Sequence, residues 1–491
     1  MGDKDLNKKK AVHQLGVFGF FAMTASMVMT VYEYPSFASS GFKLVFFLVV
    51  GGLLWFLPVS LCAAEMATVE GWEKGGIYSW VGNTLGQRWG FSALFFQWFQ
   101  ITVGFVTMCF FILAALAYVF KVDALYKNPL AMFIGVAVIV WVLTFAQLGG
   151  TKYTEKISKI GLIGGIAVPI LILNIGLVAY FMTGGKSQID LSVKSLVPDF
   201  SDVKTLVIFA SFILAYMGVE ASASHVHELK EPNKMYPEVM IMLTVLTICL
   251  DAFGGLAVAT TLPAKTLNGN LSYGVIETFE NIYVNHFGEQ FRWLVFVVAL
   301  LLALGVFAEI SAWIVGPSKA LLEAAYDGIL PARFEKTNKN GVSVFTIMLQ
   351  AVIVTIWDAV LCGSIALAGG SDSSVGYLTA IGLTVVIYLA AYVLFFLGYF
   401  VLILRKGDMK REFHIPGGRT VKLVVAAVGL FMTIITMVIS FFPSSKLTDA
   451  DNRVYQIVLI VCFIISMAAP LIIYSNRHRW SSNEKAIGDE K

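Results

Sequence analysis

Six acidic side chains lie inside or beside long apolar runs of the sequence, where little water is available to solvate a charge. An ionisable residue in a membrane-spanning helix costs about 2.5–3.5 kcal/mol on insertion scales, so each of these residues is a candidate for function. They are Glu33, Glu65, Glu220, Asp251, Glu309 and Asp358. We predict functional roles for Glu220 and Glu309. Glu65 lies near the end of its run, where solvation alone accounts for it.

Glu220 lies in the motif YMGVEAS, which begins at Tyr216 and contains Gly218. A half-helix that begins after Gly218 would direct free backbone N–H groups into a cavity. A carboxylate at that place can bind a substrate ammonium group or a proton. The alternative is that Glu220 only satisfies broken backbone of a neighbouring helix, and the two roles are compatible.

Glu309 and Trp313 are four residues apart in AEISAWIVGP, so they share one face of a helix. Together they form a possible wall of a binding site, with an indole lid beside a carboxylate. The indole N–H also gives the tryptophan a polar group to orient. The alternative is a packed tryptophan next to a hydrogen bond between helices.

Three tyrosines and two histidines complete the set of candidates. Tyr32 follows a polar interruption, and Tyr388 and Tyr392 are four residues apart in VVIYLAAY. Tyrosines at such places either gate a polar path or pack in the core. His225 and His227 follow the YMGVEAS motif, and imidazole titrates near pH 6.5, so the pair is a candidate sensor of internal acidity. Solvation at a helix end is the alternative.

Two interruptions of apolar runs contain several of these residues, among them Glu33 and Glu220. The first covers residues 24–35, TASMVMTVYEYP, and includes Ser26, Met27 and Thr30. The second is the YMGVEAS motif. Lipid cannot hydrogen-bond an unwound backbone, so an interruption survives only where it lines a cavity in the protein. Secondary transporters hold their cargo at such interruptions.

Composition identifies the class of protein. The chain is 58% hydrophobic and 14% charged, with a mean hydropathy of +0.78, whereas soluble domains are about a quarter charged. Several apolar runs exceed the roughly 18 residues typical of a membrane span. The first run is too long and irregular for a cleaved signal peptide. The five cysteines have neither metal-site spacing nor a paired framework.

We predict twelve membrane spans in an all-α protein. They cover residues 14–36, 42–66, 89–119, 129–147, 158–182, 204–224, 236–261, 292–325, 343–362, 375–404, 420–442 and 454–474. The interruptions in spans one and six predict two inverted repeats of five spans, residues 14–182 and 204–404, followed by two extra helices in 420–474. Segments 1–13 and 475–491 are then short polar ends of one transporter domain, 14–474.

Most of the 35 Lys and Arg residues lie in segments that a cytoplasmic N-terminus would place inside, so the positive-inside rule predicts that both termini are cytoplasmic. The sequence has no phosphate-binding glycine loop, no nucleophile elbow and no His/Cys metal cluster. We therefore expect neither an enzyme nor an ATP-driven pump, no cofactor or metal, and no nucleic-acid partner. A channel remains an alternative, but paired broken helices with buried carboxylates favour alternating access.

Seven segments carry a resemblance to a known family. They are TASMVMTVYEYPSFA, LCAAEMATVEGWEKGGIYSW, QLGGTKYTEKISKIG, YMGVEASASHVHE, LGVFAEISAWIVGPSKAL, NKNGVSV and FHIPGG. Together they closely resemble the bacterial glutamate/γ-aminobutyrate antiporters of the amino acid–polyamine–organocation superfamily. The resemblance extends from about Gly16 to Tyr474.

The resemblance implies a leucine-transporter-like fold in the bacterial cytoplasmic membrane. It implies exchange of external glutamate for internal γ-aminobutyrate, which a glutamate decarboxylase produces while consuming a proton, and hence acid resistance. In the family, the broken first and sixth helices hold the backbone groups of the amino acid, and aromatic residues line the site. The residues that carry over are Tyr32, Glu220, Glu309, Trp313, Tyr388 and Tyr392.

Two departures from the family pattern bear on mechanism. Arginine/agmatine relatives have a Gly-Ser-Gly turn in the first interruption, where this chain has Val28, Met29 and Thr30. Enterobacterial members carry a longer C-terminal tail that plugs the cytoplasmic path at neutral pH, whereas only residues 475–491 follow Tyr474 here. We therefore expect no such plug. A proton-coupled symporter, or an antiporter of another amino acid/amine pair, is the main alternative function.

Overall fold

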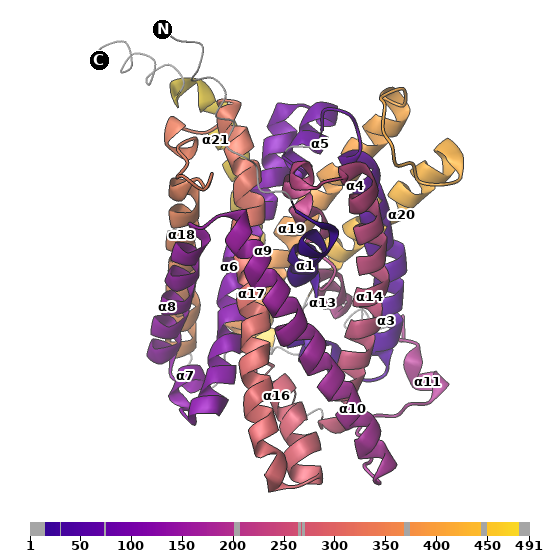
Figure 1. Ribbon diagram of the computed structural model, residues 1–491, viewed down its shortest axis with the longest axis vertical. Coiled ribbons are helices and arrows are strands. Elements are labelled where there is room, and N and C mark those ends of the chain that lie inside the picture. The colour runs from indigo at the N-terminus through magenta and orange to yellow at the C-terminus, as the bar shows by residue number, and fades with distance from the viewer. Residues whose placement is uncertain are drawn as a thin grey trace.

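The computed structural model describes residues 15–29, 31–72, 75–200, 207–263, 267, 271–367, 374–442 and 449–480. All the regular secondary structure in these residues is helical, apart from three isolated bridge pairs such as Leu15–Leu229. Eleven of the described helices are long and apolar enough to cross a membrane. Most run along the long axis of the molecule (Figure 1). The prediction of an all-α membrane protein is confirmed.

The first predicted repeat contains five spans. Its elements are α1 (Val17–Val28), η1 (Val31–Glu33), α2 (Tyr34–Ala38), α3 (Lys43–Gly51), η2 (Gly52–Phe56), α4 (Leu57–Ala67), α5 (Ile77–Leu85), α6 (Gln87–Phe120), α7 (Ala124–Lys127), α8 (Pro129–Gln147), α9 (Thr151–Ile160), η3 (Gly161–Ala167) and α10 (Val168–Met182). The short helix α5 precedes the long helix α6, and it lies at the top of the molecule in Figure 1.

The second repeat follows the same order. The short helix α11 (Val193–Leu196) lies between the repeats. The elements of the second repeat are α13 (Phe209–Leu214), η4 (Val219–Glu228), α14 (Pro232–Thr261), α16 (Gly274–Phe279), η5 (Glu280–His286), η6 (Glu289–Phe291), α17 (Arg292–Tyr326), η7 (Ala332–Phe334), α18 (Val344–Leu367) and α19 (Ser374–Arg405). The short helix α16 precedes the long helix α17 at the bottom of Figure 1, opposite to α5. This reversal is what an inverted repeat requires. We call the two ends of the molecule the α5 end and the α16 end.

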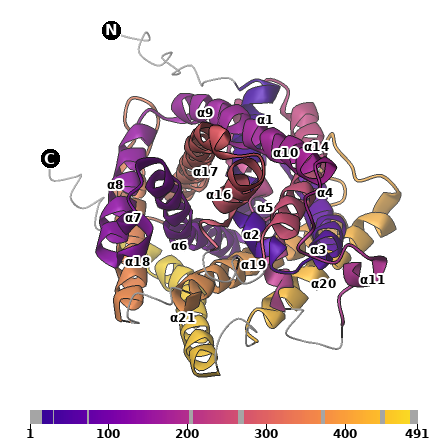
Figure 2. The same cartoon turned by 90° about the horizontal axis from the view of Figure 1, so that it is seen from below.

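Two further helices, α20 (Gly418–Ile439) and α21 (Asp449–Ser475), complete the chain. The most apolar window of α6 is 83% buried, whereas that of α20 is 28% buried and that of α21 only 17%. Seen along the long axis, α20 and α21 lie at the periphery (Figure 2). Helix α6 packs along both α17 and α19, so these three helices form the wall to which the broken helices attach.

Both predicted interruptions are breaks in the structure. Helix α1 ends at Val28, Met29 has an extended backbone, and the chain resumes as η1 and α2. In the sixth span α13 ends at Leu214, and η4 begins only after Gly218. The sixth span is absent from the eleven long apolar helices of the described residues, and it is the twelfth of the predicted spans.

Candidate functional site

Gly218 fixes the break in the sixth span. Its φ of 114° lies in the region that only glycine adopts at little cost. A Cβ atom at this position would lie 2.4 Å from Cζ2 of Trp313, so the indole packs directly on the glycine backbone. The Gly218 N–H donates to the hydroxyl of Tyr392 (3.0 Å), which satisfies a backbone group that the break exposes.

Glu220, on the first turn of η4, has hydrogen bonds to three side chains from the wall of the site. Gln97 of α6 donates to Oε1 (3.0 Å), and Tyr388 of α19 donates to the same oxygen (2.5 Å). Tyr392 donates to Oε2. The carboxyl group is 1% exposed. Glu220 therefore joins the broken sixth span to α6 and α19, and all three contacts use it as an acceptor.

Glu309 and Trp313 share one face of α17, as their spacing predicts, and that face is turned towards the broken first span. The indole N–H of Trp313 donates to the carbonyl oxygen of Met27 at the end of α1 (3.3 Å). The hydroxyl of Tyr32 donates to Oε1 of Glu309 (3.5 Å). The Trp313 ring meets the Tyr388 ring edge-on, with centroids 6.0 Å apart. Both broken helices thus contact the same turn of α17.

A central cavity with a volume of about 50 Å³ lies between these elements. Its lining includes Met27, Tyr32, Glu33, Glu309, Trp313 and Tyr388. Other lining residues follow Gln97 along α6 towards the α16 end, from Gln100 to Met108. The cavity therefore extends towards the α16 end. Glu220, which accepts a hydrogen bond from Tyr388, and Tyr392, whose ring lies against the Tyr388 ring, lie behind this lining residue.

The charge of the central cavity has a single sign. Glu33 and Glu309 are the only ionisable acids or bases other than tyrosine among its described lining residues, which include no lysine, arginine or histidine. Glu33 is close enough to Glu309 and to Asp251 of α14 to interact with both electrostatically. A ligand in the cavity thus meets carboxyl groups, hydroxyl groups and aromatic rings, without a cationic side chain to neutralise a carboxylate.

Five residues predicted for the site line the central cavity, namely Met27, Tyr32, Glu309, Trp313 and Tyr388. Gly218, Glu220 and Tyr392 lie beside it through the contacts given above. Two further predicted residues, Tyr216 and Ser26, also do not line it. The Tyr216 hydroxyl donates to the carbonyl oxygen of Leu48 (2.9 Å), and its ring stacks on Phe56, while Ser26 is buried in α1. Thr30 lies outside the described residues.

Sequence reasoning overlooked Gln97 and Gln100. Both side chains are almost fully buried in the long helix α6. Gln97 donates a hydrogen bond to Glu220. The sequence does contain a signal for them, because two amide side chains lie three residues apart in the apolar run FFQWFQITV. A buried amide needs partners, so such a pair predicts a polar neighbour on another helix.

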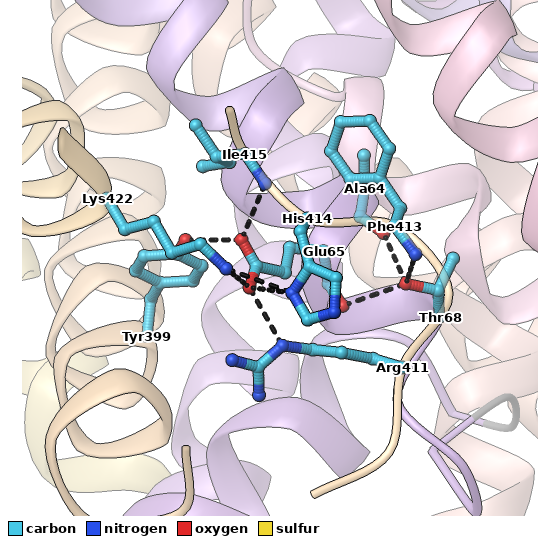
Figure 3. Close-up of polar contacts among 9 residues, drawn as sticks. All are labelled: Ala64, Glu65, Thr68, Tyr399, Arg411, Phe413, His414, Ile415 and Lys422. Carbon is cyan, nitrogen blue, oxygen red and sulfur yellow. Dashed lines mark hydrogen bonds and ion pairs between the residues drawn. The ribbon is translucent and has the colours of Figure 1, made fainter. Parts of the chain in front are cut away.

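Glu65 is not solvated, contrary to the simplest interpretation of its position. It is fully buried at the end of α4, where Arg411 (2.8 Å) and Lys422 (2.5 Å) both pair with Oε1. The Tyr399 hydroxyl (2.8 Å) and the Ile415 N–H (3.0 Å) donate to Oε2. Figure 3 shows these groups converging on one carboxylate from α19, α20 and the segment between them. Glu65 therefore links α4 to α19 and α20, and it does not line the central cavity.

The histidine expected to be solvated is also buried. Nδ1 of His225 lies 3.0 Å from Oε2 of Glu228 and 3.2 Å from Nζ of Lys319, and Lys319 pairs with the other oxygen of Glu228. Burial and the Lys319 charge lower the pKa of His225. Burial acts to raise the pKa of Glu228, but His225 and Lys319 lower it to about 2. The side chain of His227 lies outside the described residues.

Asp251 and Asp358, the remaining acidic candidates, are both buried. Asp251 is buried in α14, and its Oδ2 has no hydrogen-bond partner among the described residues. Asp358 is buried in α18, where the Cys362 thiol donates to Oδ1 (3.3 Å). The described residues contain no group of three or more His, Cys, Asp or Glu side chains arranged to hold a metal ion.

Comparison with known proteins identifies the family to which this architecture belongs. A family model described as amino acid permease matches residues 15–463. The chain belongs to this family. It is 52% identical over 469 residues to the glutamate/γ-aminobutyrate antiporter of Lactococcus lactis subsp. lactis, covering 96% of this chain and 91% of that protein. An uncharacterised transporter of Legionella pneumophila is 31% identical, covering 96% and 98%.

A solved structure agrees with the fold. A manganese transporter of Eremococcus coleocola superposes with a TM-score of 0.61 at 13% identity, covering 94% of this chain and 95% of that one. At this identity the match shows the fold alone. The amino acid permease family, the two broken helices and the reversed repeats together give this chain a leucine-transporter-like fold, and they class it as a transporter rather than an enzyme.

Proposed function

We propose that this permease exchanges external glutamate for internal γ-aminobutyrate by alternating access in the bacterial cytoplasmic membrane. The observation that carries the proposal is the 52% identity, over nearly the full length, to a relative that bears this name. The central cavity supports it, because the cavity lies between two broken helices. Such a cavity suits a carrier that exposes one binding site to each side in turn.

The cavity also supports an amino acid as cargo. The start of η4 lies beside it, and the N-terminus of a helix favours an anionic group such as the α-carboxylate of a substrate. Unwound carbonyl groups near Met27 and the carboxyl group of Glu309 favour an ammonium group. Glu220, Tyr388 and Tyr392 hold the broken sixth span in place, and Trp313 closes over the substrate. Ser26 and Tyr216 contribute through the backbone geometry of the two breaks.

The central cavity has two acidic side chains, Glu33 and Glu309, and no cationic side chain among its described lining residues. This arrangement favours transport that depends on acidic pH. A glutamate side chain that enters as a carboxylate would meet Glu33 and Glu309 without a cationic partner. A neutral γ-carboxyl group avoids that repulsion, and its population grows as the pH falls towards the glutamate pKa of about 4.3. We therefore propose that protonation of the substrate sets part of the pH dependence.

We further propose that the α5 end faces the cytoplasm with both termini, as the distribution of Lys and Arg predicts. Internal γ-aminobutyrate would come from a glutamate decarboxylase, which consumes a cytoplasmic proton. Export of the amine and import of glutamate would then remove acid at every cycle, which makes acid resistance the physiological role.

Counterflow tests the proposal directly. Purified protein is placed in liposomes loaded with γ-aminobutyrate, with glutamate or with buffer, and uptake of labelled glutamate is measured at acidic pH. Loaded liposomes should accumulate label, and buffer-filled or protein-free liposomes should not. Equal uptake into buffer-filled proteoliposomes under a proton gradient would indicate a symporter. Uptake without saturation would indicate a channel.

A further inference from the structure

A second, larger cavity lies near the α5 end, separate from the central one. It has a volume of about 610 Å³ and lies between the end of η4, the start of α9, the last turns of α17 and the segment after η7. Lys319 on its wall is six residues from Trp313, which corresponds to about 9 Å along α17. The two cavities therefore lie one behind the other along the same helix.

The second cavity carries both signs of charge, in contrast to the central cavity. Its described lining includes the cations Lys152, Lys319 and Lys339 and the anions Glu228 and Glu323. A ligand with separate positive and negative ends finds partners for both here. A ligand with charge of only one sign would be attracted by one set of these side chains and repelled by the other.

One ion pair of this lining also holds the α5 end closed. Lys319 of α17 pairs with Glu228 at the end of η4, and the backbone oxygen of Glu228 accepts the N–H of Leu15 just before α1 (2.8 Å). Ser224, one turn earlier in η4, donates to the carbonyl oxygen of Gly316 in α17 (2.9 Å). Residues from both broken spans are thus fastened to α17 at one place. These contacts join η4 and the start of α1 to the part of α17 that lines the second cavity.

We propose that the second cavity is a loading site for a zwitterion whose ammonium and carboxylate are separated by a short alkyl chain, that is, an ω-amino acid. Its carboxylate binds Lys319, with Lys152 adding attraction at the rim, and its ammonium binds Glu228. The choice of γ-aminobutyrate as the natural ligand rests on the proposed function. The site itself rests on the geometry.

The charge pattern explains why both ends of the ligand are needed. Glu228 is 5% exposed, so removing Lys319 without a replacement would leave a nearly buried carboxylate that keeps His225 but has lost its cationic partner. Breaking such a pair from one side is strongly unfavourable, whereas replacing both partners at once keeps every charge compensated. An ω-amino acid can insert between Lys319 and Glu228 and bind each of them. Docking would thereby free η4 from α17 and couple occupancy of the loading site to opening of the α5 end.

The first test compares the two sides of the membrane. In oriented proteoliposomes, Lys152→Glu should raise the apparent KM for internal γ-aminobutyrate about three- to fivefold, the effect of one exposed charge, and leave the KM for external glutamate unchanged. Lys156→Glu is the matched control, because Lys156 is exposed one turn further along α9 and does not line the cavity. Equal effects of the two variants, or equal changes on both sides, would overturn the proposal.

The second test does not depend on transport. In a chain whose native cysteines are replaced by serine, Ser318→Cys places a thiol on the cavity wall. γ-Aminobutyrate should slow its modification by a water-soluble thiol reagent, also in a Trp313→Ala background, whereas butyrate and butylamine should not. Protection without counterflow would refute the proposed function and keep the site. Counterflow without protection would keep the function and refute the site.

Discussion

The hydroxyl group of Tyr392 donates to the carboxylate of Glu220 and accepts the N–H of Gly218, so one side chain of α19 holds both the break and the acid that follows it. A break in a span exposes backbone groups that lipid cannot satisfy, and here a tyrosine from another helix satisfies one of them. The consequence is that the sixth span cannot shift without disturbing α19.

Substitution of Glu220 should separate hydrogen bonding from charge. Glu220→Gln keeps one acceptor oxygen for Gln97 and Tyr388 and should retain measurable counterflow at acidic pH. Glu220→Ala leaves three buried donors without a partner, at about 1–3 kcal/mol each, and should abolish it. Counterflow at pH 5 on protein matched by size-exclusion profile measures the difference. Equal loss in both variants would mean that an ionised carboxylate is required.

Trp313 should be needed for transport rather than for folding. Trp313→Ala removes the ring that lines the cavity and should slow counterflow at least tenfold while the protein still inserts and elutes as a single species. Trp313→Phe keeps an aromatic ring but loses the N–H that donates to Met27, so it should show an intermediate rate. Normal exchange by the alanine variant would make Trp313 a packing residue.

Gly218→Ala should destabilise the protein for two reasons, a strained backbone and a steric clash with another helix. The left-handed backbone conformation costs a residue with a Cβ atom about 1–2 kcal/mol. In addition, the new Cβ atom collides with the indole of Trp313. Gly184→Ala is the matched control, because Gly184 also has a positive φ (93°) but open space around it. Melting temperature in detergent should fall clearly further for Gly218→Ala, and equal shifts would count against the packing described here.

His225 should not act as a sensor between about pH 5.5 and 7. Burial and the Lys319 charge lower its pKa, which disfavours the protonated imidazole relative to an exposed histidine. His225→Gln should therefore leave the pH profile of counterflow unchanged there. A profile flattened by this single substitution would show that the imidazole gains its proton near pH 6.5 after all.

The Glu228–Lys319 pair should persist at acidic pH. The folded-state pKa of Glu228, about 2, lies below the ordinary value of 4.5. The group therefore contributes stability that is fully present above about pH 4.5 and is lost as the pH falls towards 2. Glu228→Gln should lower the melting temperature at pH 7 and at pH 5 by similar amounts, with the difference from the parent shrinking below pH 4. A difference that vanished already at pH 6 would contradict this assignment.

The sequence alone determined the class, the spans and the two breaks, because these depend on local periodicity and on the cost of polar backbone in lipid. Spacing along one helix was also a reliable guide, because Glu309 and Trp313, and likewise Tyr388 and Tyr392, are four residues apart and share one helix face. The tertiary structure decided which distant residues meet. Gln97 with Glu220, and Lys319 with Glu228, depend on the register between helices, which packing of the whole bundle sets. For the same reason Tyr216, beside the second break, directs its hydroxyl group to Leu48 and not to the cavity.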